Sequence, residues 1–482
     1  MKRNIILAAL LAIVSVSASA KITLPKFFGD NMVLQQQTEC NLWGTANANK
    51  TVTVSTSWNS KTYKTSADKD GKWSLKVSTP SAGGPFDITF SDGEKLTIHN
   101  VLIGEVWICS GQSNMEMPMK GFKGQPVEGA NSELLACKDN QLRLFTVKRN
   151  AQAEPVDTVT GAWNEANAET VRQFSATAYY YGRALRKSLD VPVGLIVVSW
   201  GGSACEAWMN RSWIKPEWMS YFKDVKGEVS QANVDKLQQR CPSALYNGML
   251  HPLIGMTIKG VIWYQGEENV SRASTYCDQL STMIRGWRSE WKEGDFPFYY
   301  CQIAPYDYTL IGWNYNSAYL REQQSMVEKL VPNTRMAVLL DAGLKYGIHP
   351  RKKRQAGERL ALLALGNTYG MKRLPDYAIY DNVEFRGDTA VVAFSNSREW
   401  IYFNDGTPTL ANYEVAGADG KYYQADSVWI KRNRLYIKSN KVSKPTAVRY
   451  GFRDWVDGDL MHDGLPVSSF RTVGATISES SK

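Results

Sequence analysis

The chain has 482 residues, enough for roughly three domains of about 150 residues each. Hydrophobic residues make up 43% and charged residues 21% of it, which is typical of globular proteins and excludes a disordered, collagen-like or coiled-coil chain. The formal net charge is +9, spread without the basic block that is typical of a nucleic-acid groove. We therefore expect a multidomain globular protein that binds no nucleic acid.

The first twenty residues have the pattern of a signal peptide. Lys2 and Arg3 precede the apolar stretch Ile5 to Val16, and Ala18-Ser19-Ala20 supplies a small-residue cleavage site. No cysteine follows the apolar stretch until Cys40, so no lipid-acylation site is expected, and no later apolar run predicts a membrane span. The sequence thus predicts an exported protein, periplasmic or secreted, with a signal peptide over residues 1–20.

Seven cysteines follow this segment, but their spacing indicates no metal or redox site. The sequence has no C-x-x-C and no H-E-x-x-H motif. We expect mostly buried cysteine side chains, with one or two disulfide bonds permitted by an oxidising compartment and at least one cysteine unpaired. No metal is therefore expected.

Short alternating runs at both ends of the chain predict β structure. Between residues 21 and 99 the runs Thr51–Ser55 and Trp73–Val77 flank Asp70-Gly71, a pair typical of a hairpin turn, and predict an N-terminal β-domain. Over residues 373–482 a C-terminal β region is predicted by the runs Ala390–Ser395, Ser427–Lys431 and Arg434–Lys438.

Between residues 100 and 372, buried apolar runs alternate with helical patterns. The apolar runs are Val101–Cys109, Val193–Trp200, Ile258–Tyr264, Phe298–Ile303 and Met336–Leu340. Apolar residues at three- and four-residue spacing predict helices at Ala176–Leu189, Tyr276–Trp291, Ala318–Leu330 and Arg351–Leu365. Strands and helices that alternate in this way predict a three-layer α/β domain with a five-stranded parallel sheet.

The functional residues of an open parallel sheet lie at the carboxyl ends of its strands. The first strand leads into Gly111-Gln112-Ser113-Asn114-Met115, which places a serine on a glycine-started turn, although such a segment is also typical of a helix start. The second strand leads into Gly201-Gly202, where backbone N–H groups can turn toward a ligand or make a tight turn only.

Two further strand ends carry polar groups. The third strand leads into Gln265-Gly266-Glu267-Glu268-Asn269, which offers side-chain amides and carboxylates. The fifth strand ends at Asp341, and His349 follows it after a loop. A serine and a histidine on separate strand ends of one sheet indicate acyl transfer by a serine nucleophile and a histidine base.

Together these four segments resemble the SGNH (GDSL-like) hydrolases, and more closely the sialate O-acetylesterase family within them. The matching pieces are Gly111–Met115, Trp200-Gly201-Gly202 with Glu206-Ala207-Trp208, Trp263–Asn269, and Ile348-His349-Pro350 followed by Lys353, Gly357 and Arg359. The resemblance extends to the flanks, because in that family a β-domain precedes the catalytic domain and further β structure follows it, often as one β-sandwich made from both ends.

The resemblance implies a role for each matching residue. Ser113 corresponds to the nucleophile and His349 to the general base, and the backbone N–H groups of Ser113 and Gly202 correspond to the oxyanion hole. A side-chain amide completes the hole in these enzymes, and both Asn269 and Gln265 match it by residue type. The resemblance implies no metal or organic cofactor.

One position departs from the superfamily pattern. An acid commonly stands three residues before the histidine, and here that position is Tyr346. Glu267, Asp341 or a backbone carbonyl are then the candidates for holding the tautomer of the imidazole, and we favour Glu267.

The resemblance implies hydrolysis of acetyl esters on sugars through an acetyl-enzyme, with an acetylated glycan or a sialic acid as substrate. A sialic acid carboxylate needs a cation, for which Arg351 and Lys353 beside His349 are candidates unless they only form a solvated helix face. Two alternatives stay open. One is an esterase for acetylxylan or another plant polysaccharide, and the other is a catalytically decayed glycan-binding protein, which the missing acid would suit.

Overall fold

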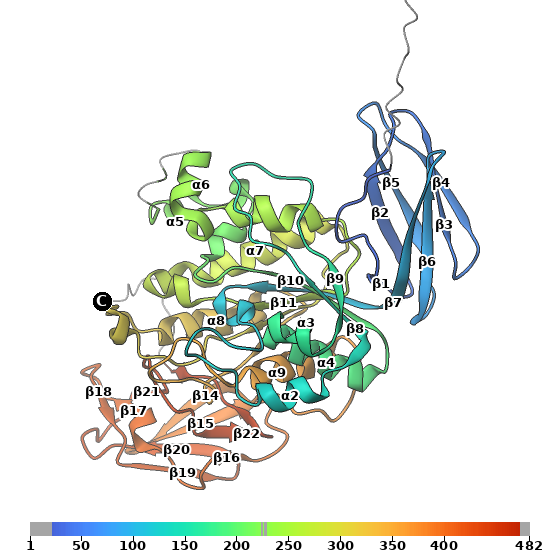
Figure 1. Cartoon of the computed structure of the whole chain (residues 1–482). Helices are drawn as coiled ribbons and strands as arrows, with labels where there is room; N and C mark the ends of the chain where they lie inside the picture. The colour runs from blue at the N-terminus through green and yellow to red at the C-terminus, as the bar shows by residue number, and fades with distance from the viewer. Residues whose placement is uncertain (1–21, 223–224, 226–228, 473–482) are drawn as a thin grey trace, which may run out of the picture.

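The computed structural model describes residues 22–222, 225 and 229–472. The predicted signal peptide, residues 1–20, lies outside them. Figure 1 shows three parts along the chain: a blue N-terminal β-domain, a central α/β domain, and an orange-to-red C-terminal β region. Within the described ranges, no helix is long and apolar enough to cross a membrane.

The N-terminal β-domain pairs its strands differently from the predicted hairpin. Strand β3 (Thr51–Thr56) pairs with β4 (Thr62–Ser66) and β6 (Gly83–Ser91), whereas β5 (Lys72–Ser78) pairs with β2 (Glu39–Thr45). The Asp70-Gly71 turn therefore leads from β4 into β5, and the expected pairing of Thr51–Ser55 with Trp73–Val77 is wrong. Because β4 reads Thr-Tyr-Lys-Thr-Ser and buries none of its residues, its sequence carried no strand signal.

The long strand β7 (Lys95–Gly111) joins the N-terminal β-domain to the α/β domain. Its first half pairs antiparallel with β6, while β1 (Val33–Gln35) pairs parallel with its middle. Its second half pairs parallel with β10 (Val193–Ser199) and β11 (Gly260–Tyr264). The predicted domain boundary at residue 99 thus falls inside one continuous strand.

The central sheet has the strand order β13-β12-β11-β7-β10-β8-β9. The five predicted strands are present as β7, β10, β11, β12 (Phe298–Cys301) and β13 (Thr334–Ala337). The described residues add a sixth parallel strand, β8 (Asp139–Thr146), and an antiparallel edge strand, β9 (Trp163–Ala166), so the predicted number was too low. Strand β8 was missed because it buries Arg143, whose guanidinium donates to the Asn31 and Asn140 carbonyls.

The four predicted helices begin and end within two residues of the expected positions. They are α4 (Ala176–Leu189), α7 (Tyr276–Trp291), α8 (Ala318–Leu330) and α9 (Lys353–Asn367). Helix α4 packs on α9 and α7 packs on α8, and Figure 1 shows α4 and α9 below the sheet and α7 above it. The predicted three-layer arrangement is confirmed.

Shorter helices cover the edges of the α/β domain. They are α1 (Ser113–Glu116), α2 (Ala130–Ala136), α3 (Ala168–Gln173), α5 (Pro216–Met219) and α6 (Gln231–Leu237). Helix α1 follows β7 directly, which places Ser113 at the carboxyl edge of the sheet.

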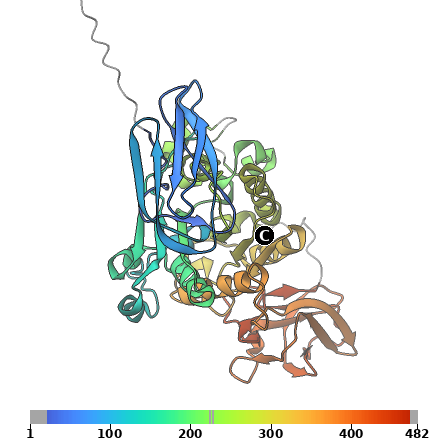
Figure 2. The same ribbon diagram turned by 90° about the vertical axis from the view of Figure 1, so that its right-hand side faces the viewer.

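The C-terminal β region contains the three predicted strands. A four-stranded sheet runs in the order β14 (Ile379–Arg386), β15 (Thr389–Ser395), β20 (Arg434–Lys438) and β19 (Ser427–Lys431). A three-stranded sheet runs in the order β16 (Ile401–Phe403), β22 (Leu460–His462) and β23 (Leu465–Pro466). A second four-stranded sheet runs in the order β18 (Tyr422–Gln424), β17 (Tyr413–Ala416), β21 (Ala447–Tyr450) and β24 (Phe470–Arg471). Figures 1 and 2 show the two β parts on opposite sides of the α/β domain, so they do not form the single sandwich that was considered.

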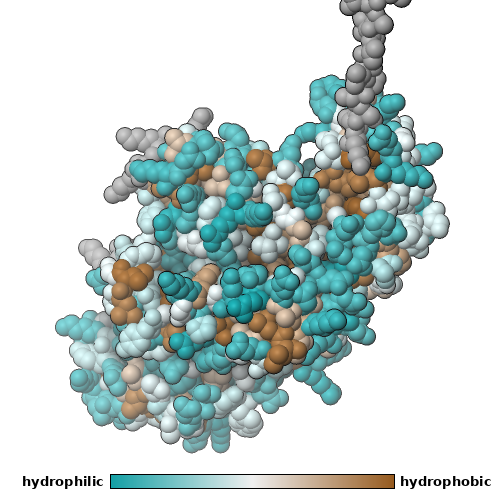
Figure 3. Space-filling model, viewed as in Figure 1, coloured by the Kyte–Doolittle hydropathy of each residue, from teal (hydrophilic) through white to brown (hydrophobic). Residues whose placement is uncertain are grey.

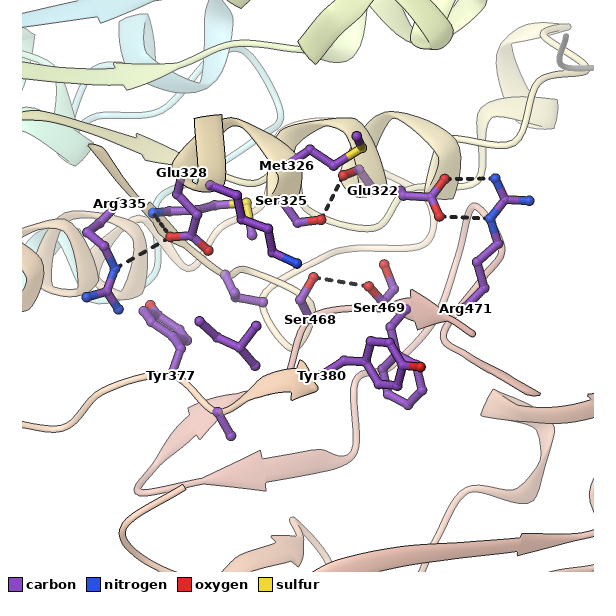
Figure 4. Close-up of a pocket in the computed structure, with 16 residues that line it drawn as sticks. Glu322, Ser325, Met326, Glu328, Arg335, Tyr377, Tyr380, Ser468, Ser469 and Arg471 are labelled. Carbon is purple, nitrogen blue, oxygen red and sulfur yellow. Dashed lines mark hydrogen bonds and ion pairs between the residues drawn. The ribbon is translucent and has the colours of Figure 1, made fainter. Parts of the chain in front are cut away.

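The C-terminal region is attached to α8 by buried polar contacts. Arg471 donates to both carboxylate oxygens of Glu322 at 2.7 and 3.0 Å, and the buried Arg321 donates to the Gly451 and Arg453 carbonyls. Figure 4 shows the cavity of about 320 Å³ at this boundary, with Arg471 pointing to Glu322. These contacts hold the C-terminal region to the α/β domain.

The cysteines and the surface agree with a well-packed globular chain. All seven cysteines are buried and none is in a disulfide bond. The face drawn in Figure 3 is mostly hydrophilic, with small and separate apolar patches. The expectation of mostly buried cysteine side chains is therefore confirmed, and the one or two disulfide bonds that were permitted are absent from the part of the chain that the structure describes.

Candidate active site

Ser113 lies on a tight turn, because the backbone before it packs closely against a neighbouring strand. At Gly111, φ is +137° and an added Cβ would lie 2.2 Å from the Tyr264 carbonyl oxygen, so only glycine fits. The Gln112 N–H donates to that same oxygen at 2.9 Å. The chain then enters α1, and the half-buried Ser113 is left with a hydroxyl and a backbone N–H that make no hydrogen bond within the described residues.

The second strand end lies against this turn. The Gly201 N–H donates to Glu116 Oε2 at 2.8 Å, and a Cβ on Gly201 would lie only 3.2 Å from the Ser113 Cβ. Gly202 follows with φ of +73°, and its N–H has no hydrogen-bond partner in the described part of the chain. Two unpaired backbone N–H groups thus lie on adjacent turns, as the predicted oxyanion hole requires.

The Asn114 side chain ties three segments together beside Ser113. Its amide nitrogen donates to Glu267 Oε1 at 2.5 Å and to the Ile348 carbonyl at 3.2 Å. Its amide oxygen accepts from the Lys353 ammonium. Because Ile348 precedes His349, this contact brings the histidine loop to the serine turn.

His349 is held by a neutral acceptor from another loop. Its Nδ1 lies 2.5 Å from Gln125 Oε1, and the Phe122 ring packs edge-on at 5.1 Å between ring centroids. An amide oxygen only accepts, so Nδ1 carries the proton and Nε2 keeps a free lone pair. Burial, together with the positive charge of Lys353, lowers the pKa of His349 to about 4, so the imidazole is neutral at pH 7.

The structure does not bring Glu267 or Asp341 to His349. Glu267 accepts from Asn114 instead; its Oε2 is buried without a partner, and burial raises its pKa. Asp341 forms a two-point ion pair with Arg359 at 2.6 Å for each contact. The predicted Glu267–His349 contact is thus replaced by Gln125, a loop residue without any sequence signal for that role.

The two side-chain amides proposed for the oxyanion hole are both engaged elsewhere. Gln265 Nε2 donates to the Ser203 carbonyl and to Asn269 Oδ1, at 3.0 and 2.8 Å. Asn269 Nδ2 donates to Glu206 and Gln279, at 3.1 and 3.0 Å. Both residues are fully buried, so neither offers a free N–H to a substrate, and their role is to join the second and third strand-end loops.

The two cations proposed to bind substrate are in different surroundings. Arg351 is exposed, whereas Lys353 is buried beneath Asn114, where burial lowers its pKa to about 7. A buried ammonium bonded to Asn114 positions the serine turn and is not available to a sugar carboxylate. The burial of Lys353 therefore argues against its predicted role as a substrate contact.

Most aromatic residues near the site belong to the core. Trp107, Trp208 and Trp263 are fully buried, whereas Trp200 is partly exposed and carries the Arg149 guanidinium 5.3 Å above its ring. Trp200 is thus the aromatic residue of this set that is able to stack on a sugar. In the described ranges, no group of three or more His, Cys, Asp or Glu side chains is arranged to hold a metal ion.

Comparisons with known proteins agree with this geometry. Residues 103–362 match the model of a family described as carbohydrate esterase, sialic acid-specific acetylesterase. The human sialate O-acetylesterase is 30% identical over 74% of this chain and 73% of its own length, and the rat enzyme is 29% identical over 77% and 78%. A crystal structure of a carbohydrate acetylesterase from Xanthomonas citri superposes with a TM-score of 0.84 at 34% identity, covering 94% of this chain and 99% of that one. The chain therefore belongs to the sialic acid-specific acetylesterase family of carbohydrate esterases, which are carboxylic ester hydrolases.

Proposed function

We propose that this protein removes O-acetyl groups from sugars through an acetyl-enzyme on Ser113, with sialic acids as the preferred substrates. The observation that carries the proposal is the state of His349: Gln125 fixes its Nδ1 proton, its Nε2 is free, and Asn114 holds its loop at the serine turn. A neutral imidazole with an open Nε2 is the base that a serine nucleophile needs.

In the acylation step Ser113 Oγ attacks the acetyl carbonyl carbon, and His349 Nε2 takes the hydroxyl proton. The backbone N–H groups of Ser113 and Gly202 donate to the oxyanion of the tetrahedral intermediate. When the intermediate collapses, the bond from the carbonyl carbon to the sugar oxygen breaks, and His349 returns its proton to that oxygen. The products are the free sugar alcohol and acetyl-Ser113.

In the deacylation step water replaces the sugar. His349 takes a proton from the water as its oxygen attacks the acetyl carbon, and the proton then passes to Ser113 Oγ as acetic acid leaves. The acid ionises to acetate in solution. Each step transiently creates an imidazolium, which Gln125 stabilises through a hydrogen bond rather than an opposite charge. The neutral acceptor therefore supplies orientation and leaves the imidazolium less stabilised than a carboxylate would.

Two alternative functions are less well supported. A decayed binding protein would not need an unpaired Ser113 hydroxyl and a tautomer-fixed His349 whose loop is held at the serine turn. An esterase for acetylxylan uses the same chemistry and differs only in its sugar. The test is acetate release by wild type and Ser113→Ala from O-acetylated sialic acid and from acetylated xylan.

We expect release from the sialic acid and a loss of at least ~1000-fold in the variant. Faster release from xylan would reassign the substrate, and equal release by the variant would remove Ser113 from the mechanism. The controls are matched circular dichroism spectra and thermal unfolding midpoints for the two proteins.

We also propose that the protein is exported, because residues 1–20 have the charge, apolar length and cleavage pattern of a signal peptide. N-terminal sequencing of the protein from its native host should begin at Lys21. A chain that retains Met1 would contradict this proposal.

A further inference from the structure

A basic cavity of about 490 Å³ lies beside the serine turn. Its rim carries Lys120, Lys123, Lys148 and Arg149, all exposed, and Ser199 at the end of β10 lies in its wall. This volume is within the range of small-molecule sites, which is about 300–1,000 Å³.

The cavity is flanked by direct contacts of both proposed catalytic groups. Glu116 lines it and accepts the N–H of Gly201, whose backbone packs on Ser113. Phe122 also lines it and packs its ring edge-on against that of His349. A sugar whose acetyl group is at Ser113 therefore has this cavity next to it.

The charge in the cavity is not balanced by the protein. Its one lining carboxylate, Glu116, is already used, because Arg149 Nε donates to its Oε1 at 2.7 Å and Gly201 N–H to its Oε2. The ammonium groups of Lys120, Lys123 and Lys148 form no ion pair with any carboxylate of the described residues. Three unpaired cations thus surround the hollow.

The cavity wall also contains an unpaired hydroxyl. Ser199 is only 5% exposed, and its Oγ is buried without a hydrogen-bond partner among the described residues. A buried hydroxyl without a partner costs free energy, which a bound acceptor would recover. Unpaired cations at the rim and an unpaired donor in the wall together fit an anion.

We propose that this cavity binds the carboxylate of an acidic acetylated sugar, with Lys120, Lys123 and Lys148 as the cations and Ser199 as a donor. The inference rests on the proposed function and replaces Lys353 as the cation that recognises the substrate. Sialic acids and uronic acids both carry a carboxylate, and the experiment below separates the two sources.

The test compares each acid with its own neutral amide. The substrates are O-acetylated sialic acid, an O-acetylated methyl glucuronoside, and the carboxamide of each, with acetate release as the readout. Wild type should favour an acid over its amide at least tenfold in kcat/KM, and the preference should shrink as sodium chloride is raised. The sugar whose acid is preferred over its amide identifies the acid that the cavity recognises.

The triple variant K120M/K123M/K148M should reduce the acid-to-amide ratio at least fivefold. The matched control K50M/K61M/K64M makes the same change in charge on exposed lysines of the N-terminal β-domain and should leave the ratio unchanged. No acid preference in wild type for either sugar, or an equal ratio in the triple variant and the control, would overturn the proposal.

Binding separates this inference from the proposed function. Isothermal titration calorimetry on Ser113→Ala should show tighter binding of an acid than of its amide, and adding the three lysine changes should abolish that difference. If no sugar releases acetate, the proposed function fails, and the calorimetry alone decides the cavity: a retained difference supports it and an absent one overturns it.

Discussion

Replacing Gln125 with glutamate would give His349 the charged partner that the superfamily pattern commonly supplies. In Gln125→Glu the carboxylate oxygen would take the place of Oε1, now 2.5 Å from His349 Nδ1. The tautomer is preserved, since a carboxylate also only accepts from Nδ1. The change therefore isolates the effect of charge from the effect of orientation.

The magnitude follows from the starting pKa of His349, about 4. An opposite charge in direct contact raises a histidine pKa by about 1–3 units, and because His349 is half-buried we expect about 1–2 units, to between about 5 and 6. Each unit corresponds to about 1.4 kcal/mol of imidazolium stabilisation. Since the imidazolium forms in the transition state, kcat/KM at pH 7 should rise by up to ~10-fold.

The assay is the pH profile of kcat/KM with p-nitrophenyl acetate from pH 3.5 to 8. The wild-type acid limb should lie near pH 4, because protonation of His349 removes the base, and in Gln125→Glu it should move upward by about 1–2 units. Gln37→Glu makes the same chemical change at an exposed position of the N-terminal β-domain and serves as the control. An unmoved acid limb in Gln125→Glu, or near-normal turnover in Gln125→Leu, would refute the assignment of Gln125 as the partner of His349.

Three further substitutions address the serine turn. Glu267→Gln and Lys353→Met each leave the other buried charge of the Asn114 cluster unpaired, and each should cost about 3–5 kcal/mol of unfolding free energy. The double variant should cost less than the sum of the two. Urea denaturation measures all three values. Lys353→Met should also move the acid limb of the pH profile to higher pH, because Lys353 lowers the pKa of His349. An unchanged acid limb would show that the two charges are not coupled. Gly202→Ala should lose about 1–2 kcal/mol of stability, because φ at this position is +73°. The control Gly294→Ala should lose a similar amount, because φ there is +69° and open space surrounds the residue. Only Gly202→Ala should lower kcat/KM, by at least ~10-fold, and equal activity in the two variants would argue against the oxyanion role.

The sequence predicted those elements whose signals are local. Helices α4, α7 and α8 carry apolar residues at helical spacing over more than ten residues, and their ends were predicted to the residue. Strands β4 and β8 were missed because β4 is polar on both faces and β8 buries Arg143, whose charge is compensated by carbonyls far away in the chain. In both cases, contacts with neighbouring segments make the residues form a strand, and the hydropathy pattern of the residues themselves does not indicate one.

The sequence alone predicted where Ser113 and His349 lie in the fold. Ser113 and His349 follow strands of one parallel sheet, and parallel strands bring their carboxyl ends to a common edge whatever the details of packing. The glycine before the serine turn is also encoded locally, because the strand must turn against the Tyr264 carbonyl.

Only the tertiary structure decided which side chains touch. Gln125 meets His349 across 224 positions of sequence, and Asn114 meets Lys353 across 239. Residue type made Glu267 the favoured partner of His349 and left Gln265 and Asn269 as equal candidates for the oxyanion hole. A hydrogen bond forms only within about 3 Å and with free donors, and both conditions depend on how distant segments pack. The alternation of strands and helices and the candidate pair Ser113 and His349 thus follow from the sequence pattern, whereas the partner of the histidine and the basic cavity are properties of the packed fold.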